Sequence, residues 1–266
     1  MPSFTDNIRN TVTLHQYPPQ KIISLVPSIT ELLHDLGLQD EVIAITKFCV
    51  HPNEWFRSKQ RIGGTKNLHI EQIKNLQPDL IIAGKEENVK EQIDELAQTI
   101  PVYVTDVTTY HEALQMILDI GELTARENKA AQLVNEIEKN FSSLQIREAV
   151  PAAYLIWRNP YITVGGDTFI SSMMERCGLQ NIFKAHERYP EIPLEQLPAL
   201  NCRLLLLSSE PYPFKEKHLQ EIQTILPGIK IILADGEMFS WYGSRMLHAA
   251  AYFQQLMAEC KKILQS

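Results

Sequence analysis

Short apolar runs of strand length alternate along the chain with stretches in which apolar residues recur every three or four positions. The runs are bounded by Pro, Gly or polar residues and are typical of strands buried on both faces, whereas the spacing between them is helical. The expected strands are residues 22–26, 42–46, 80–83, 102–104, 153–157, 204–207 and 231–233. The expected helices are residues 28–36, 67–76, 88–98, 111–123, 127–147, 171–177, 194–200 and 244–264, and residues 4–20 form an irregular or hairpin leader. The alternation predicts an α/β protein with parallel sheets.

The longest helical pattern runs from Glu127 to Arg147 and contains neither Gly nor Pro. About 20 residues at a rise of about 1.5 Å each span roughly 30 Å, the width of a small domain. We therefore expect a linking backbone helix at residues 126–148, between an N-terminal lobe at residues 1–125 and a C-terminal lobe at residues 149–266.

The two expected lobes share three short segments in the same order. The segment ITELLHDLGLQ at 29–39 matches ISSMMERCGLQ at 170–180, EQIKNLQPDLII at 71–82 matches EQLPALNCRLLL at 195–206, and IPVYVTD at 100–106 matches IKIILAD at 229–235. The repeat predicts a duplicated unit, with two Rossmann-like lobes that each contain a parallel sheet.

Composition excludes several classes of protein. The 266 residues carry a net charge of -7, so no basic surface is offered to nucleic acid, and no apolar stretch approaches the about 18 residues of a membrane span. The four cysteines, Cys49, Cys177, Cys202 and Cys260, form no CxxC, and buried reduced thiols are expected for Cys177 and Cys202. The eight histidines show no HExxH and no close pairing, so the sequence offers no converging ligands for a bare metal ion.

The order of motifs resembles a known family of receptors. SLVPSITE at 24–31, a turn ending in Pro52, Gly63-Gly64, NLHIEQIKNLQPDLII at 67–82 and the long helix resemble the class III substrate-binding proteins of ABC importers, most closely their vitamin B12-binding members. The resemblance covers nearly everything from Ile22 onward. It implies two rigid lobes and a ligand held in the cleft between them: a cobalamin-like corrinoid, haem or a ferric siderophore. It also implies no intrinsic cofactor, a monomer and a partner in the transmembrane permease dimer.

Two loops after expected strands combine aromatic rings with a cation. The first contains Trp157, Arg158 and Tyr161, and the second contains Trp241, Tyr242 and Arg245. Rings give apolar contact area to a large planar ligand, and Arg can bind groups on its rim. Ordinary surface or core packing is the alternative for each residue.

Further candidates follow the strands of the first lobe. Phe48, Cys49 and His51 occupy the loop that in the family lines the cleft, and His51 is a candidate axial ligand to cobalt or iron or else a hydrogen-bonding loop residue. Lys85 and Tyr189 are candidates by position, with solvated loop residues as the alternative.

Glu71 and Glu195 are superimposed by the internal repeat. The resemblance implies that a Glu on each lobe docks onto arginines of the permease, since an exposed carboxylate at the start of a helix is rigidly presented. The alternative is that each Glu complements its helix dipole.

Two other functions remain open at this point. A cytoplasmic tetrapyrrole-binding sensor and a chelatase-like enzyme would both suit a chain whose first residues lack the charged and apolar regions of a secretory signal. The resemblance instead implies a periplasmic or extracytoplasmic protein without catalytic activity.

Overall fold

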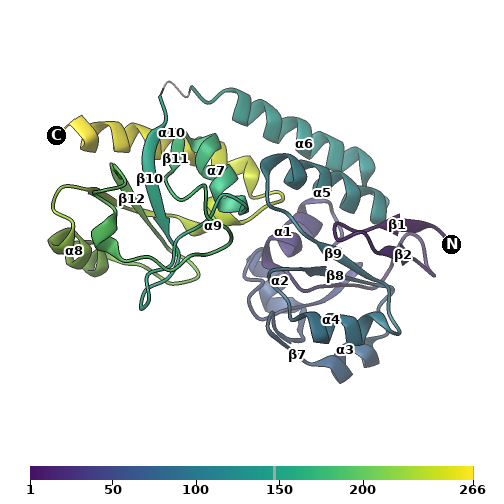
Figure 1. The fold of residues 1–266 in the computed structure, drawn as a ribbon. Coiled ribbons are helices and arrows are strands. Elements are labelled where there is room, and N and C mark those ends of the chain that lie inside the picture. The colour runs from purple at the N-terminus through teal and green to yellow at the C-terminus, as the bar shows by residue number, and fades with distance from the viewer. Residues whose placement is uncertain (146–147, 266) are drawn as a thin grey trace. The chain divides into compact units, whose positions relative to one another are not determined.

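The computed structural model describes residues 1–145 and 148–265, which fold into two compact α/β units (Figure 1). The first unit comprises Met1–Val107, His111–Asn135 and Tyr242–Arg245. The second comprises Thr108–Tyr110, Glu136–Trp241 and Met246–Ser266. The chain therefore passes between the units several times rather than once.

The first unit is built on a five-stranded parallel sheet with the strand order β5-β4-β3-β8-β9. The strands are β3 (Ile22–Ser24), β4 (Val42–Ile45), β5 (Gln60–Arg61), β8 (Leu80–Gly84) and β9 (Val102–Thr105). Residues from α3 (Ile70–Leu76) and α4 (Lys90–Ala97) pack on one face, while α5 (Tyr110–Leu123) lies on the opposite face (Figure 1). Burial on both faces explains why these strands are continuous apolar runs.

A hairpin of β1 (Ser3–Thr5) and β2 (Thr11–Thr13) precedes this sheet, which confirms the predicted hairpin leader. Its turn is held by the buried carboxylate of Asp6, which accepts hydrogen bonds from the backbone of Ile8 (3.1 Å) and Asn10 (2.7 Å). The backbone N–H of Asn7 donates to the carbonyl of Val104 (3.1 Å). The hairpin is thus attached to the edge strand β9 at one point.

The second unit contains a four-stranded parallel sheet with the order β11-β10-β12-β13. Its strands are β10 (Val150–Leu155), β11 (Leu179–Asn181), β12 (Leu204–Ser208) and β13 (Lys230–Ala234). One face packs against α8 (Glu216–Ile225), and α7 (Phe169–Cys177), α9 (Gly236–Ser240) and α10 (Met246–Gln265) lie on the other (Figure 1). The predicted α/β class with parallel sheets is confirmed.

The three repeated segments occupy equivalent places in the two sheets. The second pair of segments ends in β8 and β12. β8 lies next to β3 and β12 lies next to β10, which are the first strands along the chain in their sheets, and β9 and β13 each form an edge. In the first pair, α1 (Pro27–Asp35) and α7 are each followed by a glycine with positive φ, 80° at Gly37 and 90° at Gly178. Both glycines adopt the left-handed conformation that ends a helix, as the shared Gly-Leu-Gln predicts.

Several predicted boundaries are wrong for local reasons. Ser28 does not cap α1, since the helix begins at Pro27, which lacks the N–H that a cap would satisfy. The helix predicted from Asn67 begins only at Ile70, because Gly63–Gly64 (β6) and Asn67–Leu68 (β7) pair as a small antiparallel ladder. The helix predicted over 194–200 is one 3-10 turn, η1 (Leu194–Gln196).

The predicted linking helix is shorter than expected. α6 (Glu127–Ser142) ends before Leu144, and Ile146 and Arg147, the end of the predicted helix, lie outside the described residues. Residues 127–135 of α6 belong to the first unit and residues 136–142 to the second. The sequence also missed α2 (Asn53–Ser58) and α8. Among the described residues, no helix is both long enough and apolar enough to span a bilayer.

Candidate ligand-binding faces

The loop after β4 presents an aromatic ring to solvent. Phe48 is 51% exposed, and the ammonium of Lys47 lies 5.1 Å from the centre of its ring. Gly64 leaves the space for this packing, since a Cβ there would lie 3.1 Å from both Phe48 Cε2 and Lys47 Cε. In a parallel sheet the loops at the carboxyl ends of strands form the usual ligand-binding edge, and Phe48 lies on such a loop.

Cys49, predicted as a ligand contact, is instead part of the core of the first unit. Its side chain is fully buried, and its Sγ lies 3.0 Å from the hydroxyl of Thr30 and 3.2 Å from that of Thr46. Burial raises the pKa of the Cys49 thiol. Because no part of the thiol reaches solvent, Cys49 fixes the loop in place and does not face a ligand.

His51 lies half-buried two residues further along the same loop. Its electrostatic interaction with Glu31 opposes the rise in the pKa of that carboxyl. Within residues 1–145 and 148–265, no group of three or more His, Cys, Asp or Glu side chains is arranged to hold a metal ion. Axial coordination of a ligand's own metal by His51 therefore stays a prediction.

Arg245 forms a two-point ion pair with Glu31. Arg245 Nε lies 2.9 Å from Glu31 Oε2, and Nη2 lies 2.7 Å from Oε1. Both side chains are largely buried, and burial raises the pKa of Glu31 while the guanidinium opposes that rise. The sequence predicted Arg245 as a contact to the rim of the ligand but did not predict its partner Glu31. The signal that could have identified Glu31 is its place in the Ser-Ile-Thr-Glu segment at the start of α1.

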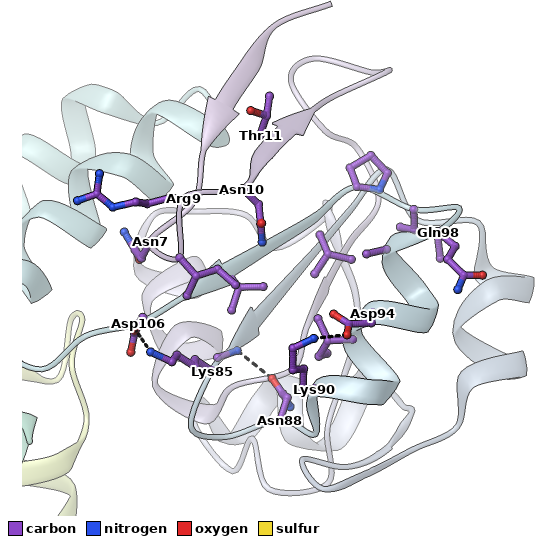
Figure 2. Close-up of a pocket in the computed structure, with 18 of the residues that line it drawn as sticks. Asn7, Arg9, Asn10, Thr11, Lys85, Asn88, Lys90, Asp94, Gln98 and Asp106 are labelled. Carbon is purple, nitrogen blue, oxygen red and sulfur yellow. Dashed lines mark hydrogen bonds and ion pairs between the residues drawn. The ribbon is translucent and has the colours of Figure 1, made fainter. Parts of the chain in front are cut away.

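Lys85 and Tyr242 complete the predicted residues of the first unit. Lys85 Nζ lies 2.5 Å from Asp106 Oδ2, and Figure 2 shows the two side chains pointing toward each other. The hydroxyl of Tyr242 lies 3.5 Å from that of Thr105, and burial raises the pKa of Tyr242. Glu87, in the same loop as Lys85, was missed by the sequence, and burial raises the pKa of its carboxyl.

The second unit brings Trp157, Arg158 and Tyr161 together after β10, as predicted. Trp157 is 40% exposed and packs edge-on against Tyr212, with ring centres 5.8 Å apart. Arg158 is ion-paired with Glu221, and hydrogen bonds to the hydroxyls of Tyr212 and Tyr161 raise its pKa. Tyr212 and Glu221 were not predicted, because they lie more than 50 residues along the chain and only the fold brings them to Arg158.

Tyr189 lies on a segment that is attached to the same loop. The N–H of Thr163 donates to the carbonyl of Pro190 (3.0 Å), and Ile162 forms an antiparallel bridge with Glu191. Tyr189 is 36% exposed, and the guanidinium of Arg188 lies 5.6 Å from its ring centre. The second unit therefore presents two exposed rings, Trp157 and Tyr189, from neighbouring segments.

The second predicted combination of rings and a cation is divided between the two units. Trp241 belongs to the second unit, where its indole N–H donates to Glu210 (2.9 Å), whereas Tyr242 and Arg245 belong to the first. The three side chains have separate partners because the chain passes from one unit to the other between Trp241 and Tyr242. The first combination, by contrast, lies within one unit.

Glu71 and Glu195 are both exposed. Glu71 is in the first turn of α3 with 83% of its side chain exposed, and its contact with Lys74 Nζ is long, at 3.5 Å. Lys74 lies closer to Glu95, at 2.7 Å. Glu195 is in η1, so only Glu71 is presented by an α-helix.

Taken together, each unit offers exposed rings near the carboxyl edge of its sheet, and the cations that the sequence predicted in each unit have carboxylate partners. The rings are Phe48 in the first unit and Trp157 and Tyr189 in the second, and the cations are Lys85, Arg245 and Arg158. Such faces can bind a large, largely apolar molecule.

Comparisons with known proteins identify the family of the chain. The sequence profile of the periplasmic binding protein family matches residues 22–226. A vitamin B12-binding protein of Vibrio campbellii is 29% identical over 197 residues, which cover 72% of this chain and 71% of the relative.

Solved structures share the fold. The periplasmic vitamin B12 binding protein of Vibrio cholerae superimposes with a TM-score of 0.74 at 21% identity, covering 92% of this chain and 99% of that one. A periplasmic haem-binding protein of Roseiflexus gives 0.76 at 18% identity, covering 92% and 99%. Since the family profile spans most of both units, the chain belongs to the periplasmic binding protein family, as its motifs predicted.

Proposed function

We propose that this chain is the substrate-binding protein of an ABC importer and that its ligand is a corrinoid of the cobalamin type. The observation that carries the choice of ligand is the pairing of the predicted cations. Arg245 is held by Glu31, Arg158 by Glu221 and Lys85 by Asp106. A cation that already has a carboxylate partner attracts a second carboxylate weakly, because the two anions repel each other.

This pairing leaves Lys47, beside the ring of Phe48, without a carboxylate partner among the described residues, so it favours a ligand with few anionic groups among those that the sequence left open. Haem carries two propionate carboxylates, and many ferric siderophores are anionic, so both would favour unpaired cations. The rim of a corrin ring carries mainly neutral amides, which can bind hydroxyls and backbone groups, and its faces offer apolar area for the rings of Phe48, Trp157 and Tyr189. The similarity to vitamin B12-binding proteins supports the same choice.

The remaining features of the proposal follow from this role. The protein acts as a monomer outside the cytoplasm, performs no chemistry and delivers its ligand to a transmembrane permease. Glu71 and Glu195, one on each unit, are the carboxylates that we propose dock onto the permease, and their exposure supports this role.

An absorbance and calorimetric titration with cyanocobalamin, aquocobalamin and haemin tests the ligand. We expect saturable binding of both cobalamins with affinity greater than that for haemin. Trp157→Ala should weaken cobalamin binding about tenfold or more, since a buried ring contact is worth about 1.4 kcal/mol or above. Tyr17→Ala, which removes an equally exposed ring that packs against Phe4 of the N-terminal hairpin, is the matched control.

The same titration tests His51. A band shift of aquocobalamin that disappears in His51→Ala would identify His51 as the axial ligand. Tighter binding of haemin than of either cobalamin would reject the corrinoid and leave the family assignment intact, and failure to bind any of the three would reject the tetrapyrrole class.

A further inference from the structure

The second unit contains a buried histidine that the proposed function does not use. His218 is in the first turn of α8 and is 4% exposed. Its ring packs against those of Tyr212 and Phe214, with ring centres 5.5 and 5.8 Å away. Burial of a polar ring among aromatic side chains is favourable only where its nitrogens find hydrogen-bond partners. Those partners therefore show what the imidazole holds in place.

The two nitrogens of His218 join the start of α8 to Tyr212. Nδ1 accepts a hydrogen bond from the backbone N–H of Lys215 (3.0 Å). A nitrogen that accepts carries no hydrogen, so the neutral ring has its hydrogen on Nε2. Nε2 lies 3.4 Å from the hydroxyl oxygen of Tyr212, to which it donates a long hydrogen bond.

Tyr212 in turn contacts three consecutive residues of the loop after β10. Its backbone N–H donates to the carbonyl of Ile156 (3.2 Å), and its ring packs edge-on against that of Trp157, with centres 5.8 Å apart. Its hydroxyl accepts a hydrogen bond from the guanidinium of Arg158. The position of Tyr212 therefore fixes both the exposed ring and the cation of this ligand face.

The same loop is attached to α8 at a second point. Glu221 is ion-paired with Arg158 and lies three positions after His218, on the same side of the helix. The exposed fraction falls from 40% at Trp157 to 4% at His218. His218 therefore supports the exposed ring from the side of the core.

The surroundings of His218 favour its neutral form. A proton on Nδ1 would face the N–H of Lys215, so the imidazolium could not keep that hydrogen bond. Burial lowers the pKa of His218, and three nearby cations lower it further: Lys217, Arg158 and Lys215. Glu221 opposes this effect. The hydrogen bond from Nε2 to Tyr212 thus belongs to the form of His218 that is present at neutral pH.

We infer that His218 is a positioning residue for ligand binding: its neutral imidazole holds Tyr212, and Tyr212 holds Trp157 and Arg158 in the arrangement that receives the ligand. The inference rests on the proposed function, because it concerns a face that we propose binds the corrinoid. Tyr212 and His218 act through Trp157 and Arg158 in this scheme, since His218 is buried behind them.

Two substitutions of His218 separate its two hydrogen bonds. In His218→Asn the amide oxygen takes the place of Nδ1, but no atom takes the place of Nε2. In His218→Gln the amide nitrogen takes the place of Nε2 and can donate to Tyr212. We expect His218→Asn to weaken cyanocobalamin binding at least about fivefold, and His218→Gln to stay within about twofold of the parent protein.

Ile222→Val is the matched control for loss of packing in α8. It removes one methyl group from a fully buried residue on the same helix, and we expect it to leave cyanocobalamin affinity within about twofold of the parent protein. Tyr212→Phe should weaken binding as His218→Asn does. The double variant should lose no more than either single variant, because both substitutions break the same contact.

A second readout needs no ligand. The chain has three tryptophans, so labelling with 5-fluorotryptophan gives three ¹⁹F resonances, and Trp157→Phe assigns that of Trp157. We expect His218→Asn to shift the Trp157 resonance and to leave that of Trp55, in the first unit, in place. His218→Gln should leave both in place.

The two readouts distinguish failure of the inference from failure of the proposed function. Parent affinity in His218→Asn, or equal losses in the Asn and Gln variants, would overturn the inference, because the imidazole would then only fill space. If the parent protein binds no cobalamin, the proposed ligand is wrong and the ¹⁹F comparison decides alone. An unmoved Trp157 resonance in His218→Asn would then overturn the positioning role.

Discussion

At the scale of single residues, the carboxylate that pairs with each candidate cation limits how strongly that cation can attract another anion. Arg245 and Glu31 are 214 positions apart in sequence, yet they form a two-point ion pair that is largely buried. Removing either partner of such a pair leaves a charge without compensation in a poorly solvated place. We therefore interpret Arg245 as a residue that positions the Tyr242–Arg245 segment on the first unit.

Glu87 gives a pH dependence that can be measured. Burial raises the pKa of its carboxyl, the nearby Glu86 raises it further, and Lys66 opposes the rise. The folded state thus holds the proton to higher pH than the unfolded chain does. The contribution of Glu87 to the free energy of unfolding is therefore full below the unfolded pKa of about 4.3, and is lost as pH rises through the folded pKa.

We predict that Glu87→Gln removes this loss, so that the variant becomes more stable relative to the parent protein as pH rises from about 4.5 to 7.5. Urea unfolding at four pH values across this range measures the difference. Glu91→Gln controls for loss of an exposed acidic side chain in the neighbouring helix. Parallel stability profiles for the parent protein and the Glu87→Gln variant would refute the assigned role.

At the scale of elements, α5 and α6 pack through a glycine. A Cβ on Gly121 would lie 2.4 Å from the Cβ of Ala130, which is fully buried, so the helices approach closely only because position 121 lacks a side chain. This contact lies within the first unit and fixes the start of α6 there. The periodicity of the sequence predicted both helices but not the residue that sets their spacing.

We predict that Gly121→Ala destabilises the protein by about 1 kcal/mol. Ala favours a helix interior by about 1 kcal/mol over Gly, but overpacking of a tight contact costs about 1–3 kcal/mol. Thermal and urea unfolding would detect the change. Gly228→Ala is the matched control, since a Cβ there meets nothing within 4 Å, and adding Ala130→Gly to Gly121→Ala should recover part of the loss.

At the scale of the whole molecule, both units follow one plan and each carries an exposed glutamate. Glu71 lies in the first turn of α3 before β8, and Glu195 lies in η1 before β12, at the equivalent place in the repeat. The strand order from β4 to β9 corresponds to that from β11 to β13. A duplicated protein that presents one carboxylate per unit suits a permease composed of two similar halves.

We predict that Glu71→Ala together with Glu195→Ala leaves cobalamin affinity unchanged and abolishes cobalamin uptake by cells that depend on this protein. The physical reason is loss of charge-assisted contacts with arginines of the permease. The matched control is Glu91→Ala with Glu216→Ala, which removes exposed first-turn carboxylates from α4 and α8. Normal uptake by the double variant would exclude docking through Glu71 and Glu195.

Local patterns in the sequence were sufficient for much of the fold. Continuous apolar runs predicted the main strands because parallel strands are buried on both faces, and Gly37 and Gly178 marked helix ends because their conformation needs a missing Cβ. Errors arose where local signals were ambiguous. Proline replaced a side-chain cap at α1, and a two-residue ladder replaced the start of α3.

Part of the candidate site was also readable from sequence. Trp157, Arg158 and Tyr161 are neighbours along the chain and stay together in the second unit, and Phe48 follows β4 at an exposed edge. Cys49 lies beside Phe48 but is buried, because the direction of a loop side chain depends on the residues that pack against it, here Thr30 and Thr46.

The sequence by itself thus determined the α/β class, the internal repeat and the family, since these depend on periodicity and on motifs that are local in the chain. Only the tertiary structure decided which carboxylate neutralises each cation and that Trp241 and Tyr242 belong to different units. Those features depend on distances between residues far apart along the chain, and such distances exist only once the chain has folded.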